Sequence, residues 1–173
     1  MKKIKLFTDS SVNPQEKVGF GAYLLLKENN ISFEDMKKDI KTKRFEDTSS
    51  TKLELQTLLW SLEEINDKDV IIEIYTDCQN IIGLQDRRER LEKNNFHSSA
   101  GKLMNNHDLY KEFFEKLDEL NLTFIKVKGH KKNSLKDEID TIFNLIEKIC
   151  LFRINKQYLL HPKFLFHCSC LID

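Results

Sequence analysis

The chain has 173 residues, a length that suits one domain with a substantial core. Hydrophobic residues make up 40% and charged residues 32%, which excludes an intrinsically disordered or membrane-embedded chain. Lys plus Arg and Asp plus Glu both total 28, so the formal net charge is zero. This balance excludes a protein whose whole surface attracts nucleic acid, while a local basic groove stays compatible with it.

No stretch approaches the ~20 apolar residues of a membrane span, and no secretory signal is visible. The four cysteines show no spacing typical of a disulfide framework. We therefore expect reduced thiols, a cytoplasmic location and no membrane partner.

The first part of the chain predicts three strands. Residues 3–8 alternate between polar and apolar side chains, which indicates a half-covered strand that ends at Asp9. A turn at Asn13-Pro14 leads to a second strand over residues 19–26. A third, more polar strand is expected between Ile31 and Lys43.

The rest of the chain alternates between helical and extended patterns. Leucines at helical spacing predict a helix from about Thr51 to Asn66, and a nearly continuous apolar run predicts a buried strand before Asp77. The elements expected after it are a short helix through Ile81 and Leu91, a loop over 92–106, a helix over 109–120, a strand over 123–127, and a last helix that starts near Ser134–Asp137. This order predicts an α/β fold, a mixed sheet with helices packed on it.

The composition changes from about Leu151, because residues 151–173 contain a single acid, Asp173. We expect one domain over residues 1–150 and a C-terminal extension of unknown structure over residues 151–173.

Four acids lie where predicted strands end or helices begin. Asp9 and Asp77 follow strands, and Glu54 and Asp140 lie in the first turns of helices. Sites in open α/β sheets form at the carboxyl ends of strands, so these side chains can converge. Hard cations such as Mg²⁺ prefer oxygen ligands, and two such metal ions about 3.5–4 Å apart need three to four carboxylates between them.

Each acid also has a structural alternative. Glu54 follows Thr51 by three residues and can complete a capping box. Asp77 can be a helix N-cap, Asp9 can form an Asx-turn, and Asp140 lies in an acidic run typical of a solvated helix face.

Five segments in chain order resemble type 1 ribonuclease H. They are Phe7-Thr8-Asp9-Ser10-Ser11 with Asn13-Pro14 and Gly19-Phe20-Gly21-Ala22, then Lys52-Leu53-Glu54-Leu55, Tyr75-Thr76-Asp77-Cys78-Gln79, Val127-Lys128-Gly129-His130, and Asp140 ten residues further on. The resemblance covers roughly Lys2 to Cys150. It implies the ribonuclease H-like fold, a mixed five-stranded sheet with helices on both faces.

The resemblance also implies an activity, the two-metal hydrolysis of the RNA strand of RNA–DNA hybrids. Asp9 is then expected to bridge two Mg²⁺ ions, with Mn²⁺ as the alternative metal, and Asp140 to complete the site that positions the attacking water. Glu54 and Asp77 are expected to hold the metal beside the leaving 3′ oxygen. His130 is expected to assist proton movement or product release rather than to bind metal.

Substrate contacts follow from the same resemblance. Asn13 and Gln79 match positions that contact the minor groove, where the 2′-hydroxyl distinguishes RNA from DNA. Lys128, Lys131 and Lys132 cluster beside the histidine and are expected to meet phosphates. We expect the chain to act as a monomer on the hybrid.

The chain departs from the family pattern at several of these places, and Ser50-Thr51 replace the polar amides that many members have before the glutamate. Ser10 stands where the family usually has Gly, and Asp140 is followed by Thr141-Ile142-Phe143 instead of a small, Ala-containing sequence. Two other functions stay open: another metal-dependent nuclease of the same fold, such as a junction resolvase, and a non-catalytic nucleic-acid-binding module.

Overall fold

β1 (Lys2–Asn13) is the middle strand of a five-stranded sheet with the order β3-β2-β1-β4-β5. The computed structural model describes residues 2–27, 32–127 and 137–159. The other elements are β2 (Val18–Leu26), α1 (Phe33–Asp39), β3 (Lys41–Phe45), α2 (Ser50–Leu62), β4 (Val70–Thr76), α3 (Gln79–Ile82), the 3₁₀ turn η1 (Gln85–Arg87), α4 (Arg88–Lys93), α5 (His107–Glu119), β5 (Asn121–Lys126) and α6 (Glu138–Leu159).

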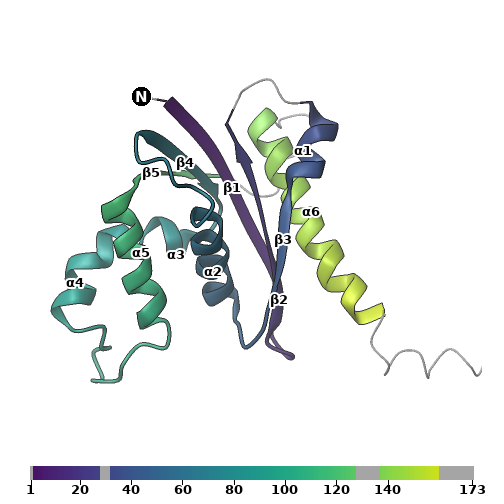
Figure 1. Ribbon diagram of the computed structural model, residues 1–173. Coiled ribbons are helices and arrows are strands. Elements are labelled where there is room, and N and C mark those ends of the chain that lie inside the picture. Colours follow the sequence, from purple (N-terminus) through teal and green to yellow (C-terminus); the bar gives the residue numbers. More distant parts are fainter. Residues whose placement is uncertain (1, 28–31, 128–136, 160–173) are drawn as a thin grey trace, which may run out of the picture.

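The sheet is mixed, as the sequence predicts. β1 pairs antiparallel with β2, and β2 pairs antiparallel with β3. On its other side β1 pairs in parallel with β4, which pairs in parallel with β5. The ribbon shows this sheet between two groups of helices, with α2 to α5 on one side and α1 and α6 on the other (Figure 1).

Strand alternation builds one core on each face of the sheet. Leu6 points into the larger core, where β1 and β4 meet α2 and α5. Phe7, its neighbour, points into the smaller core beneath α1 and α6. Successive strand residues face opposite sides, so every second residue of β1 looks toward α6.

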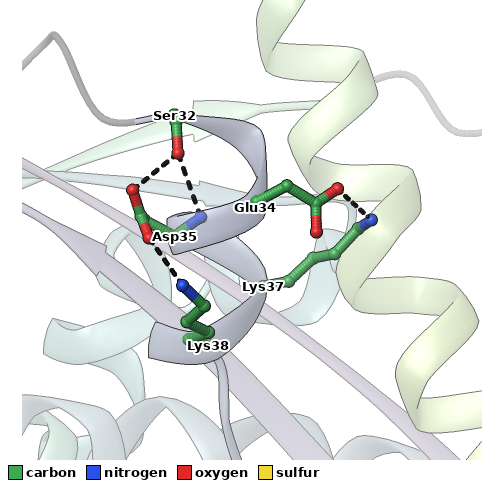
Figure 2. A network of polar contacts seen from close by, with 5 residues as sticks. All are labelled: Ser32, Glu34, Asp35, Lys37 and Lys38. Carbon is green, nitrogen blue, oxygen red and sulfur yellow. Dashed lines mark hydrogen bonds and ion pairs between the residues drawn. The ribbon is translucent and has the colours of Figure 1, made fainter.

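α1 stands where a third strand was expected, and β3 begins only at Lys41. A third strand is therefore present, but it begins later than expected, because polar contacts rather than an apolar stripe fix the preceding residues as α1. Ser32 caps the helix by accepting from the Asp35 backbone N–H at 3.2 Å. Lys37 pairs with Glu34 at 2.8 Å and Lys38 with Asp35 at 2.9 Å, as Figure 2 shows.

β1 is longer than predicted and runs past Asp9 to Asn13. Asp9 still lies beside an opening in the sheet, because the pairing of β1 with β4 ends at Phe7 and Tyr75 while the pairing with β2 continues to Asn13. The carboxylate is therefore placed by the end of β4 rather than by the end of its own strand.

α6 continues without a break through position 150, where the domain boundary was expected, and its residue Ile154 is still buried. The boundary thus falls inside a helix and stays a prediction. The turn expected at residues 28–30 and the helix start expected at Ser134 lie outside the described residues. Within the described ranges, no helix combines the length and apolar content needed to cross a membrane.

Candidate active site

Asp9 is a buried acid on the α6 side of the sheet. Its side chain points the same way as Phe7, two residues earlier, and the residue is only 7% exposed. Burial and the charges of Glu54 and Asp77 raise the pKa of Asp9 well above its usual value. An acid in this position is stabilised by a cation.

Glu54 reaches the sheet from the second turn of α2. Ser10 Oγ donates a 2.8 Å hydrogen bond to Glu54 Oε1, while Oε2 is buried and has no hydrogen-bond partner in the described part of the chain. Burial raises the pKa of Glu54 to about 7, against the lowering effect of the Ser10 hydrogen bond, and the charge of Asp77 adds to the rise. The capping-box alternative with Thr51 does not hold, because the N-cap of α2 is Ser49.

Asp77 follows the last residue of β4 and is exposed. It is not the N-cap of α3, since that position belongs to Cys78, whose side chain makes no cap hydrogen bond. The backbone after β4 is held by Thr76 Oγ1, which accepts from the Cys78 N–H at 3.2 Å. The side chain of Asp77 therefore lies at the edge of the site and does not cap α3.

These three acids make a donor set suited to a hard divalent cation. All donors are carboxylate oxygens, one of them a buried oxygen without a partner among the described residues, and the charges of Glu54 and Asp77 both raise the pKa of Asp9. Across the described ranges, no three acid, histidine or cysteine side chains already stand within joint reach of one ion. Closing the site around a metal thus requires side-chain rotation, for which the exposed Asp77 is the best placed.

The comparisons with known proteins agree with this arrangement. The RNase H family model matches residues 1–142. The chain is 32% identical over 152 residues to the ribonuclease H of Clostridium botulinum (strain Hall), covering 83% of this chain and 95% of that one. The chain belongs to the RNase H family. The ribonuclease H of Caldicellulosiruptor saccharolyticus is 27% identical over 144 residues, with 82% and 94% of the two chains covered.

A solved structure supports the RNase H fold. The crystal structure of LC9-RNase H1, described as a type 1 RNase H with the type 2 active-site motif, superposes with a TM-score of 0.61. The two chains share 16% identity, and the match covers 83% of this chain and 69% of that one.

Asp140 lies at the start of α6 and is buried. Its Oδ2 accepts from the Asp137 N–H at 3.2 Å, and its own N–H donates to Asp137 Oδ1 at 2.8 Å. This reciprocal pair is the arrangement of a capping box. The α6 acid whose charge raises the pKa of Asp9 is Glu147, which the sequence analysis did not single out.

The expected substrate-binding residues are described only in part. Asn13 Oδ1 accepts from the backbone N–H groups of Gln15 and Glu16 at 2.8 and 3.2 Å, an Asx-turn that shapes the β1–β2 hairpin. Gln79 is exposed on the first residue of α3, two residues from Asp77. His130, Lys128, Lys131 and Lys132 lie outside the described residues.

A hollow of about 450 Å³ opens between the β1–β2 turn, the start of α2 and the loop before α5. Its lining combines two ammonium groups with amide and hydroxyl groups and one carboxylate, and it includes Lys17, Lys52, Asp47, Ser49, Asn105 and Asn106. The sequence analysis missed this surface. Its residues come from three separate segments, so no local motif connects them.

Proposed function

We propose that this chain hydrolyses the RNA strand of RNA–DNA hybrids at the cluster formed by Asp9, Glu54 and Asp77. The observation that carries the proposal is this cluster itself. The charges of Glu54 and Asp77 raise the pKa of Asp9, and the charge of Asp77 raises the pKa of Glu54, in a chain of the RNase H family. Relatives that cover most of the same length bear the name ribonuclease H.

The cluster is proposed to hold two Mg²⁺ ions, with Mn²⁺ as a substitute. Bound ions of this kind activate a water molecule and stabilise the attacking and leaving oxygens of an in-line phosphoryl displacement. Asp9 is proposed to serve both ions. Asp140 of α6, which matches the family motif, is proposed to supply the fourth carboxylate.

The protein's own groups prepare the site before metal arrives. Ser10 fixes one oxygen of Glu54 and leaves the other buried without a partner among the described residues, so that Oε2 is available to a cation. Thr76 holds the backbone that carries Asp77. Ligands held in this way need less reorganisation when the charge of the transition state develops.

Substrate binding is proposed to extend from this cluster across the β1–β2 turn. Asn13 follows Asp9 in β1 and Gln79 follows Asp77 at the start of α3, and both are proposed to contact the minor groove, where the RNA 2′-hydroxyl is exposed. The hollow with Lys17 and Lys52 has the cations and amide donors that a backbone phosphate requires.

A second set of contacts is proposed on the segment that follows β5. His130 is proposed to assist proton transfer or product release, and Lys128, Lys131 and Lys132 to bind phosphates. We further propose action as a monomer in the cytoplasm. The free thiols of Cys78 and Cys150 agree with a reducing compartment.

A cleavage assay tests the proposed function. An end-labelled RNA strand is presented as RNA–DNA hybrid, RNA duplex or single strand, with a DNA duplex as control, in Mg²⁺, Mn²⁺ or EDTA. Metal-dependent cutting of the hybrid alone, lost in Asp9→Asn, is the expected result. Failure to cut any substrate with either metal would overturn the proposal in favour of a binding module.

A further inference from the structure

The single tryptophan of the chain, Trp60, lies half-buried where α2 meets β3, the edge strand of the sheet. Its ring meets Tyr23 of β2 edge to face with 4.6 Å between the centroids, and it meets Phe45 of β3 in the same way at 6.2 Å. Tyr23 is fully buried and anchors the inner side of the indole, whereas Phe45 is half-buried like Trp60. Two aromatic rings therefore reach the surface side by side.

Lys43 stands over this pair of rings. Its Nζ lies 5.3 Å from the Phe45 centroid and 5.5 Å from the Trp60 centroid, so one ammonium group contacts the faces of both rings. Because Lys43 is exposed, these ring faces border solvent rather than the core. Lys43, Phe45 and Trp60 form what we call the edge patch.

The edge patch carries a positive charge that no acid balances among the described residues. Lys41 pairs with Glu64 at 2.8 Å, and Arg44 pairs with Glu46. Lys43 lies between these two pairs in β3, and in the described ranges no acid lies within ion-pair distance of it. Its ammonium group is therefore available to an anion from solution.

The edge patch continues from the hollow at the start of α2. Phe45 ends β3 two residues before the lining of the hollow begins, and the Thr48 N–H donates to the Lys17 carbonyl oxygen at 2.9 Å, which holds this segment against the β1–β2 turn. Lys52 in the hollow and Trp60 are eight residues apart on α2, roughly 12 Å of helix. An extended chain that leaves the hollow along α2 thus reaches the patch over a short distance.

The chemistry of the edge patch fits a single-stranded nucleic acid. Exposed aromatic faces stack on bases of any sequence, and neighbouring cations follow the phosphates. Edge strands also bind other strands, but lysines on the edge oppose such pairing. β3 carries Lys41, Lys43 and Arg44 within five residues, which favours an anionic partner over an added protein strand.

We propose that the edge patch binds single-stranded RNA or DNA that extends from the end of an RNA–DNA hybrid, with a base on Trp60 and a phosphate at Lys43. The place of the hybrid rests on the proposed function, whereas the binding of a single strand does not. β2 separates β3 from β1, so the contact lies outside the carboxylate cluster. It gives hybrids with a single-stranded end an advantage in binding over blunt hybrids.

Tryptophan fluorescence of the full-length chain tests this proposal, because Trp60 is the only tryptophan. Single-stranded oligo(dT) and oligo(U) are titrated separately, in EDTA to prevent cleavage, into wild type, Lys43→Ala and Phe45→Leu. Arg44→Ala is the matched control, since Arg44 is the next cation of β3 and faces the other side of the sheet. Thermal unfolding checks that each variant is folded.

Binding to hybrids provides a second readout. Fluorescence anisotropy in EDTA compares a blunt hybrid with one that has a single-stranded extension, and cleavage of the blunt hybrid is measured in Mg²⁺. We expect oligonucleotides to quench Trp60 in wild type, with at least about 5-fold weaker single-strand binding in Lys43→Ala and Phe45→Leu. Lys43→Ala should also lose the advantage of the extended hybrid while it cuts the blunt hybrid at the wild-type rate. The difference between oligo(dT) and oligo(U) shows whether the strand is DNA or RNA.

Unchanged Trp60 fluorescence with both oligonucleotides would overturn the proposal and leave the edge of β3 to a protein partner. Equal losses in Lys43→Ala and Arg44→Ala would also overturn it, because they would indicate general attraction to a basic surface. If Phe45→Leu does not fold, the exposed Lys43 decides the outcome. A wild type that is quenched by single strands but cuts no hybrid rejects the proposed function alone, and cleavage without quenching rejects the edge patch alone.

Discussion

The hydroxyl of Ser10 joins β1 to α2 by donating a 2.8 Å hydrogen bond to Glu54 Oε1. The two residues are 44 positions apart in the chain and come from opposite sides of the contact between sheet and helix. The RNase H family usually has Gly at the position of Ser10. In this chain the serine hydroxyl instead holds the carboxylate of Glu54. Supporting contacts of this kind orient ligands and favour their charged form.

Ser10→Ala is expected to weaken metal binding and to shift its pH dependence. Without the hydrogen bond, burial of Glu54 is less well compensated and its pKa rises further. The affinity for Mg²⁺ near pH 7 should fall by about 10-fold, in the range found for second-sphere residues. Calorimetry from pH 6 to pH 9 measures the change.

Ser11→Ala is the control for this substitution, because Ser11 is the next residue of β1 and faces the other side of the sheet. It should leave the affinity unchanged. Equal losses in the two variants would mean that the Ser10 hydrogen bond has no special role.

The metal-free protein is expected to lose stability as the pH rises through the raised pKa of Glu54. The unfolded chain releases this proton near the ordinary value of 4.5, whereas the folded chain keeps it until about 7. The stabilising contribution is therefore complete below about 4.5 and is lost as the pH approaches 7, up to about 3 kcal/mol for a half-buried group. Asp9, whose pKa is also raised, adds to the same trend.

Urea unfolding in EDTA at pH 5 and pH 8 measures this effect in wild type and Glu54→Gln. The difference between the two proteins isolates the contribution of Glu54, and excess Mg²⁺ should restore stability at pH 8 because it binds the folded state. Parallel pH profiles for wild type and Glu54→Gln would contradict the prediction.

Gly21→Ala is expected to destabilise the fold and to reduce activity. A Cβ at this position of β2 would overlap the side chain of Thr57 on α2, whose Cβ would lie 2.9 Å away. Because α2 carries Glu54, relief of the overlap would move that carboxylate away from β1. We expect a cost of about 1–3 kcal/mol in the free energy of unfolding.

The double variant Gly21→Ala/Thr57→Ala should recover part of that stability, because the overlapping atoms of Thr57 are removed. Gly83→Ala is the matched control, since its nearest neighbour, the Gln79 carbonyl oxygen, is 3.4 Å away. Denaturant unfolding is measured for wild type, for these three variants and for Thr57→Ala, the single variant that the comparison requires. Additive losses in the double variant would show that β2 and α2 are not in close contact at Gly21.

Lys52→Ala is expected to weaken hybrid binding in a salt-dependent way. If Lys52 contacts a phosphate from the hollow near the start of α2, its loss should reduce the slope of log affinity against log salt by about 0.9. Fluorescence anisotropy in EDTA measures binding without cleavage. Lys38→Ala on α1, on the other side of the sheet, should leave the slope unchanged, and an unchanged slope in Lys52→Ala would remove this lysine from the interface.

Local patterns in the sequence were sufficient for most elements and for a hypothesis about the site residues. Alternation and helical spacing predicted the strands and the main helices, because each strand or helix buries one face in the core. Asp9, Glu54 and Asp77 were identified because each lies within a short motif on such an element. The helix α1 was not predicted. It is stabilised by its cap and by Lys–Glu and Lys–Asp pairs, so its sequence lacks the apolar stripe by which helices are recognised.

The tertiary structure alone decided which side chains meet. The contact between Ser10 and Glu54 spans 44 residues, and the contact that sets the register of α6, between Cys150 and Asp9, spans 141. The register of α6 against β1 is likewise set by the packing of Ile146 and Cys150 onto the sheet, whose strands come from distant parts of the chain.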